Sequence, residues 1–228
     1  MARNFDGTND NIGFGADASI AGFTVKTWAA WVRHGATGVQ DLIVRKTGAA
    51  TGWNSFTRTA ADDTVSITQQ CATTDGSYRG STALGTGWRH IAMVHDLTGT
   101  PPIDPVIYVD GAAETITVIT TPVGASAVDL TADAFAVGET GAGAADFLGD
   151  LEAMSYDNTL WDAATVNRAR WWGRPGGGLE VYHPLFTDKL TNEGTGTADG
   201  TASGTTVAAS LIPMVRPGQA MLGFGVGW

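Results

Sequence analysis

The dipeptide Asp110-Gly111 most strongly constrains the fold of this chain. It stands between two runs, 105–110 and 113–120, in which apolar and polar residues alternate. Alternation with a period of two is typical of a strand with one buried face, and Asp-Gly between two such runs favours a two-residue hairpin turn. The sequence therefore predicts an antiparallel β-hairpin at this point.

The rest of the chain repeats this pattern of a short strand followed by a turn. Further strands are predicted in seven ranges: 23–33, 41–46, 64–71, 88–95, 135–138, 147–156 and 179–185. One segment, 161–172, has helical spacing of Ala163, Val166 and Ala169 and ends before Gly173 and Pro175. Range 187–206 is predicted as loop with one weak strand. The prediction is an all-β antiparallel sandwich with one short helix.

Composition agrees with this fold class. Glycine accounts for 31 of 228 residues and charged residues for only 16%, whereas about 25% is usual in globular domains. Such a chain favours short strands and tight turns over long helices. A length of 228 residues is compatible with a single β-sandwich.

Charge and targeting signals narrow the possible partners. The formal net charge of −10 argues against nucleic acid and anionic lipid as partners. The N-terminus has no apolar signal segment, and no apolar run is as long as a membrane span of about 20 residues. Cys71 is the single cysteine, so no intrachain disulfide can form, and we expect it to be a small buried apolar residue. Synthesis in a cytoplasm is expected.

Five motifs, in order along the chain, resemble those of the laminin G-like, concanavalin A-like jelly-roll family. Two of them resemble strands that open the family's domain, and three resemble its central and late strands. The matching segments are FDGTNDNI at 5–12, FTVKTW at 23–28, WRHIA at 88–92, IYVDG at 107–111 and FLGDLEAM at 147–154. The resemblance implies a jelly-roll sandwich over residues 1–206.

The same resemblance has implications for the C-terminal part and for function. Residues 179–206 resemble a segment that often precedes the first strand in this family, so we expect them to complete the sheet after the domain. Stand-alone versions resemble phage virion proteins of the head-decorating or fibre type. This resemblance implies a non-catalytic structural protein in a virion, made in the host cytoplasm, that binds capsid proteins and itself. By analogy the homo-oligomer would be a trimer.

Residues 207–228 form a separate feature, an apolar and glycine-rich arm. A free tail of this kind would promote aggregation, so we expect it to dock on its own domain or on a neighbouring subunit. The contact residues are expected to be Met214, Val215, Arg216, Leu222, Phe224 and Trp228. The arm is interpreted as an assembly element.

Catalytic residues are not indicated by the sequence. Asp150 and Glu152 stand at alternate positions of one strand, about 6.6–6.8 Å apart on one face, as a glycosidase pair would require. The next position on that face is Met154 and not a third acid, so an anchoring role is the preferred interpretation. His90 and His95 are five residues apart and should face opposite sides of their strand, and no histidine has metal-ligand spacing.

Calcium and glycan sites are the remaining possibilities. Calcium prefers oxygen ligands, and the candidates by residue type alone are Asp6, Asn9, Asp10, Asp62, Asp63 and Asp110, although turn roles are preferred. No cofactor is predicted. A carbohydrate-binding module for adhesion is the alternative function, with Trp53 or Trp172 as the ring on which a sugar would stack. The other interpretation is packing, in which Trp28, Trp31 and Trp88 lie in the core and Trp171-Trp172 cap the sandwich. A glycoside hydrolase is the third possibility.

Overall fold

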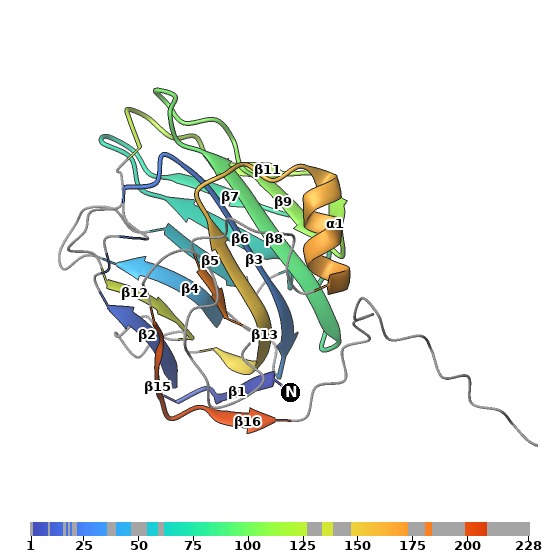
Figure 1. Cartoon of the computed structure of the whole chain (residues 1–228). Coiled ribbons are helices and arrows are strands. Elements are labelled where there is room, and N and C mark those ends of the chain that lie inside the picture. The colour runs from blue at the N-terminus through green and yellow to red at the C-terminus, as the bar shows by residue number, and fades with distance from the viewer. Residues whose placement is uncertain are drawn as a thin grey trace, which may run out of the picture.

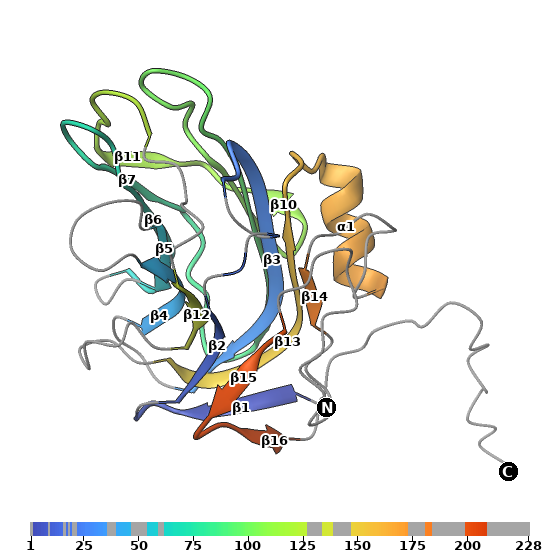
Figure 2. The same cartoon turned by 60° about the vertical axis from the view of Figure 1, so that its left-hand side comes forward.

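Two antiparallel β-sheets pack face to face and form the body of the molecule (Figures 1 and 2). The computed structural model describes residues 2–8, 10–15, 17, 19, 22–35, 40–46, 54–58, 62–126, 134–138, 147–172, 181–183 and 199–208. Within this part of the chain each sheet has eight strands. The predicted all-β antiparallel sandwich with one short helix is confirmed.

Sheet A carries the long central strands. Its order is β10-β9-β8-β3-β13-β1-β16, and β14 also pairs with β13. The strand bounds are β1 Ala2–Asp6, β3 Val25–His34, β8 Trp88–Asp96, β9 Val106–Val109, β10 Ala112–Ala113, β13 Leu148–Asp157, β14 Val181–His183 and β16 Thr206–Ala208.

Sheet B is built from shorter strands. Its order is β11-β7-β6-β5-β4-β12-β2-β15. The strand bounds are β2 Asn11–Gly15, β4 Gln40–Lys46, β5 Asn54–Arg58, β6 Val65–Gln69, β7 Gly76–Arg79, β11 Thr117–Thr120, β12 Ala134–Val137 and β15 Thr201–Ser203. In β6 the side chains of Val65 and Ile67 are buried and those between them are half-buried, the alternation expected of a sheet with one face on the core.

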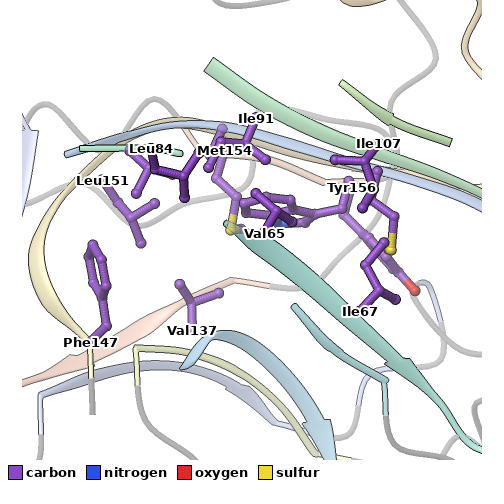
Figure 3. Close-up of a cluster of buried hydrophobic side chains, with 14 of the residues drawn as sticks. Val65, Ile67, Leu84, Ile91, Ile107, Val137, Phe147, Leu151, Met154 and Tyr156 are labelled. Atoms are coloured by element: carbon purple, nitrogen blue, oxygen red, sulfur yellow. The ribbon is translucent and has the colours of Figure 1, made fainter. Parts of the chain in front are cut away.

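The main core fills the space between the two sheets (Figure 3). Sheet A contributes Trp28 and Leu151, and sheet B contributes Ile67 and Tyr78, all at most 1% exposed. At the rim of this core the Phe5 and Phe147 rings meet edge to face, with their centroids 5.3 Å apart. Burial of these apolar and aromatic side chains stabilises the sandwich.

Helix α1, Ala163–Trp172, covers part of the outer face of sheet A. Asp162 caps its first turn, because the Asp162 carboxylate accepts a hydrogen bond of 2.8 Å from the Thr165 amide. A second apolar cluster, which includes Trp31, Trp161 and Val166, lies under the helix. Within the described residues, no helix has the length and apolarity to cross a lipid bilayer.

A buried aspartate fastens the segment that joins β13 to α1. The Asp157 carboxylate accepts hydrogen bonds from the Trp161 indole, at 2.7 Å, and from the Thr159 hydroxyl, at 2.9 Å. The Thr27 hydroxyl of β3 donates to the Thr159 carbonyl and accepts from the Trp161 amide. These bonds fix the angle at which the helix leaves the sheet.

The predicted hairpin is present. Val109 pairs with Ala112 across Asp110 and Gly111, whose φ angles are 52° and 84°, as a type I′ turn requires. The prediction of one strand over 113–120 is wrong, because this range is divided between the sheets. Its first part belongs to β10 in sheet A, and its last four residues form β11 in sheet B.

Several other boundaries differ from the sequence prediction. Segment 5–12 spans the end of β1 and the start of β2, which lie in different sheets, because the Asp6 amide donates to the Asp10 carboxylate and the chain turns there. Strands β5 and β7 are not predicted; each is short and carries few large apolar residues. The range 187–206 holds β15 and the start of β16 where one weak strand is predicted.

The C-terminal strands lie on both sheets. β15 pairs with β2, and β16 pairs with β1. β16 extends to Ala208, and most of the arm predicted for 207–228 lies outside the described residues. The division into a domain over 1–206 and an arm over 207–228 stays a prediction.

Candidate functional site

The two acids of β13 lie buried on the outer face of sheet A. Asp150 and Glu152 are each 2% exposed, and Leu151 between them faces the core. Asp150 accepts a hydrogen bond of 2.7 Å from Arg33 Nε and forms an ion pair of 2.5 Å with Arg33 Nη2. It also accepts a hydrogen bond of 3.0 Å from the side-chain amide of Asn4. Asp150 therefore anchors three neighbouring strands, which is the anchoring role that the sequence favours.

A β-bulge changes the side-chain pattern of β13 after Glu152. The register with β3 shifts between Glu152 and Ser155, and Ala153 has a φ of 53°. As a result Met154 faces the core between the sheets. The expectation that Met154 shares the face of Asp150 and Glu152 is wrong, because an inserted residue reverses the alternation.

Arg33 and Trp88 form a half-buried pair beside Asp150. They pair directly in the register of β3 and β8, and the Arg33 guanidinium lies 5.5 Å from the centre of the Trp88 ring. Trp88 is half-buried against the cluster beneath α1. The assignment of Trp88 to the core is correct for one part of its ring only. Sequence patterns do not reveal the role of Arg33, because its partners, Trp88 and Asp150, come from two other strands.

Trp171 is the exposed aromatic residue at the end of α1. The residue is 44% exposed, and the Arg170 guanidinium lies 4.7 Å from the ring centre. Trp28 and Trp31 are buried, as predicted. Of the two predicted platforms, Trp53 lies outside the described residues, and of Trp172 only the backbone is described.

The last turn of α1 connects these residues. The Arg170 carbonyl accepts a hydrogen bond of 3.0 Å from the Trp31 indole, and Arg33 is two residues further along β3 on the same face. Two aromatic–arginine pairs therefore lie on this side of the molecule, Trp88 with Arg33 on sheet A and Trp171 with Arg170 at the end of α1. We call these four residues the outer-face site.

The two histidines of β8 face opposite sides of sheet A, as predicted. The His90 ring meets Trp31 on the outer face at 5.5 Å, and the His95 ring meets Tyr78 in the core at 6.1 Å. Burial lowers the pKa of each to about 3, and a nearby cation, Arg170 or Lys26, acts in the same direction. Both imidazoles are neutral at physiological pH.

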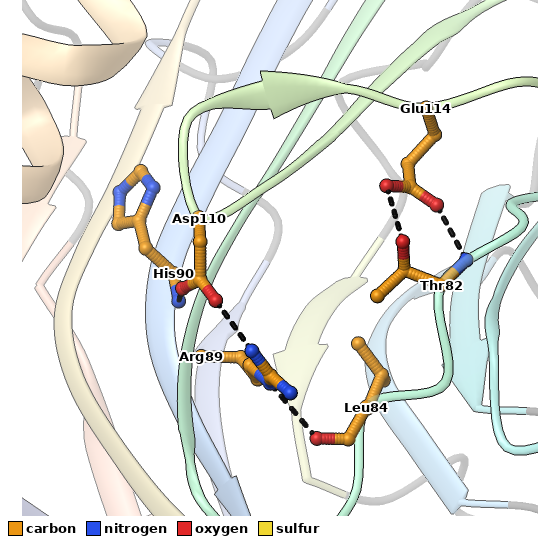
Figure 4. A network of polar contacts seen from close by, with 6 residues as sticks. All are labelled: Thr82, Leu84, Arg89, His90, Asp110 and Glu114. Atoms are coloured by element: carbon orange, nitrogen blue, oxygen red, sulfur yellow. Dashed lines mark hydrogen bonds and ion pairs between the residues drawn. The ribbon is translucent and has the colours of Figure 1, made fainter.

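A polar network secures the hairpin and the loop beside it (Figure 4). The Asp110 carboxylate accepts from Arg89 at 2.7 Å and from the His90 amide at 3.0 Å, and Arg89 also donates to the Leu84 carbonyl. On the next segment the Glu114 carboxylate accepts from both the amide and the hydroxyl of Thr82. These groups use their bonds to hold the loop.

In the described part of the chain the candidate calcium ligands do not form a cluster of three or more. Asp10 accepts from the Asp6 amide, Asp63 accepts from the Gly85 amide at 2.9 Å, and Asp62 pairs with Arg79. Among the described residues no group of three or more His, Cys, Asp or Glu could hold a metal ion. Asn9 lies outside them. The turn and anchoring roles agree with these contacts.

The predicted contact residues of the arm, Met214, Val215, Arg216, Leu222, Phe224 and Trp228, lie outside the described residues. Cys71 is buried, as predicted, and burial raises its pKa. The described residues thus provide one exposed aromatic site, and its chemistry is that of ring faces and guanidinium donors.

Comparisons with known proteins address the fold. No protein-family model matches the chain, and no curated protein matches it. Among solved structures, a protein from Bacteroides ovatus to which carbohydrate binding is ascribed has a TM-score of 0.67 at 19% identity, over 94% of this chain and 61% of that one. The chain thus spans less than two thirds of that protein.

Two further solved structures have the same fold. One is a native heptameric SAP-like pentraxin from Limulus polyphemus, with a TM-score of 0.55 at 11% identity, over 74% of this chain and 80% of that one. The other is the CBM40 of the Ruminococcus gnavus IT-sialidase bound to α2,3 sialyllactose, with a TM-score of 0.52 at 11% identity, over 71% and 91%. This chain has a concanavalin A-like jelly-roll fold.

Proposed function

We propose that this chain is a non-catalytic carbohydrate-binding domain and that Trp171 is its stacking platform. The observation that carries the proposal is the exposure of Trp171, which is 44% exposed at the end of α1, whereas Trp28, Trp31 and Trp161 are each at most 6% exposed. An aromatic ring at the surface loses the favourable burial that holds the others in the core. A ligand that covers the ring restores that contribution.

The neighbouring groups suit a sugar. The face of a pyranose that carries its C–H bonds stacks on an aromatic ring, and its hydroxyl groups need donors and acceptors at the edge. Arg170 and Arg33 supply planar donors beside Trp171 and Trp88. The Arg33 side chain is 38% exposed although it also binds Asp150, so it is held in one orientation and still reachable.

The comparisons support this proposal over the capsid role. The CBM40 structure was solved with a sialyllactose bound, and carbohydrate binding is ascribed to the Bacteroides ovatus protein. Burial of Asp150 and Glu152, with Asp150 committed to Arg33, argues against their use as a glycosidase pair. The carbohydrate-binding alternative from the sequence is therefore our main proposal.

The test compares wild-type protein with Trp171→Ala on a broad glycan array, followed by calorimetric titration of the strongest glycan. Removing the ring should weaken binding about tenfold, the equivalent of about 1.4 kcal/mol. Leu160→Ala is the matched control, because Leu160 is an exposed apolar residue of 47% just before α1 and carries no ring. Its affinity should equal that of the wild type.

Two results would refute the proposal. The first is a wild-type protein that binds no glycan of the array. The second is a Trp171→Ala variant that keeps full affinity while its circular dichroism matches the wild type. Loss of binding in Leu160→Ala to the same degree would show that the effect comes from a disturbed helix and not from the ring.

Decoration of a phage capsid is a second proposal, and location in a virion belongs to it. The observation that favours it is an exposed apolar strand, β11, at one side of the sandwich. Such a strand suits contacts between subunits. A protein that stays monomeric at all concentrations would remove this support.

A further inference from the structure

The two sides of the sandwich differ in what they present. One side is closed by β15 and β16, the end strands of the two sheets, which follow each other in the chain. The opposite side is closed by β10 and β11, again consecutive, and Figures 1 and 2 show β11 far from β16. The C-terminal segment therefore leaves the described fold on the side opposite β11.

Strand β11 is the end strand of sheet B within the described part of the chain, and all four of its residues are exposed. Val118 is 40% and Ile119 50% exposed, and Val123 shortly after the strand is 48% exposed. The register with β7 shifts between Val118 and Thr120, so two consecutive apolar side chains are exposed there. We call Val118, Ile119 and Val123 the β11 strip.

We infer that residues 211–215 of a second copy of this chain dock on the β11 strip. These residues read Leu-Ile-Pro-Met-Val, an apolar run without charge that follows shortly after β16. An end strand with exposed apolar residues binds an extended segment through backbone hydrogen bonds and apolar contacts. Residues 211–215 and the β11 strip are both apolar, so each would bury the other's exposed side chains.

Chain length favours a second copy over the same molecule. Seven strand spacings separate β15 from β11 along sheet B, a path over the sheet of about 34 Å at roughly 4.8 Å each, and β16 lies on the β15 side of the sandwich (Figures 1 and 2). Val215 is seven residues beyond Ala208, so even a fully extended chain carries it only about 25 Å. The strip of a neighbour that lies beside β16 is within reach.

This contact joins different surfaces of the two subunits. The donor segment starts at the β16 side and the acceptor strip lies at the β11 side, so the interface is head-to-tail. Such an interface closes into a ring when the rotation between subunits permits and otherwise continues as a filament. It is independent of the proposed sugar binding, because Trp171 belongs to α1, which covers the outer face of sheet A, whereas β11 is an end strand of sheet B.

The experiment measures mass by size-exclusion chromatography with light scattering across a wide concentration range. The full-length wild type should be an oligomer, and Ile119→Lys and Met214→Lys should each raise the dissociation constant at least about tenfold. Ile103→Lys is the matched control, because Ile103 is 58% exposed and lies outside the strip. It should assemble like the wild type.

A second measurement keeps the inference falsifiable if a variant is poorly folded. A fluorescent peptide of residues 209–217 should bind full-length Met214→Lys, whose strip is intact, and should not bind the double variant with Ile119→Lys. An oligomer that Ile119→Lys breaks and Met214→Lys leaves unchanged would overturn the inference in favour of β11 pairing with itself. A monomeric wild type that binds no peptide would also overturn it, without bearing on glycan binding.

Discussion

Acid should destabilise this protein through His95, a neutral imidazole in the core. The His95 side chain is 1% exposed, its ring meets the edge of Tyr78, and Lys26 is its direct partner in the register with β3. Burial, assisted by the Lys26 charge, lowers the pKa of His95 to about 3. The unfolded chain has the ordinary histidine pKa of about 6.5.

The sign and size of the effect follow from these two values. Below pH 6.5 the unfolded state binds a proton on His95 and the folded state does not, so the free energy of unfolding falls with pH until about pH 3. Between pH 6.5 and 5 the loss is about 2 kcal/mol. His90 has the same lowered pKa and adds a similar loss.

Urea unfolding of wild type and His95→Gln at pH 7.5 and at about pH 5 isolates this contribution. The wild type should lose about 2 kcal/mol more than the variant over this range, since all other groups titrate alike in both. Equal losses would refute the argument. If the variant does not fold, NMR titration of the wild type provides the check. A His95 signal that titrates near pH 6.5 in the folded protein would also refute the argument.

Three further predictions concern the backbone, a buried hydrogen bond and the thiol. Gly149→Ala should lower the urea midpoint more than Gly111→Ala, because a Cβ at Gly149 would lie 2.0 Å from a backbone carbonyl of β3, whereas at Gly111 it meets a movable side chain; equal midpoints would contradict this. Asp157→Ala should cost about 1–3 kcal/mol in unfolding free energy, because the Trp161 indole loses its acceptor; full stability would exclude that role. Cys71 should react with a thiol reagent slowly in native protein and rapidly in urea; rapid native reaction would show that it is accessible.

Much of the fold can be read from local patterns. The alternation in β3, β8 and β13 and the Asp110-Gly111 turn are encoded within a few residues, because strand faces and type I′ turns depend on local geometry. The strand boundaries within segment 5–12 and range 113–120 cannot be read from local patterns, because each of these segments is divided between the two sheets. The point at which a chain crosses between sheets depends on how the sheets pack.

The site is less visible in the sequence. Trp171 is noticed as a tryptophan at a helix end, but its exposure depends on how α1 lies on sheet A. The Arg33–Trp88 and Arg33–Asp150 contacts join residues that are 55 or more positions apart in the chain. No motif within one segment contains such a set, because it arises from strand order.

Residue periodicity and turn chemistry are enough to predict the fold class, the hairpin, the burial of Trp28 and Cys71 and the opposite faces of His90 and His95. Three features become visible only in the folded chain: the contact of Asp150 with Arg33, the β13 bulge that turns Met154 into the core, and the exposure of Trp171. Each of these depends on register and packing between distant segments, which local patterns do not encode.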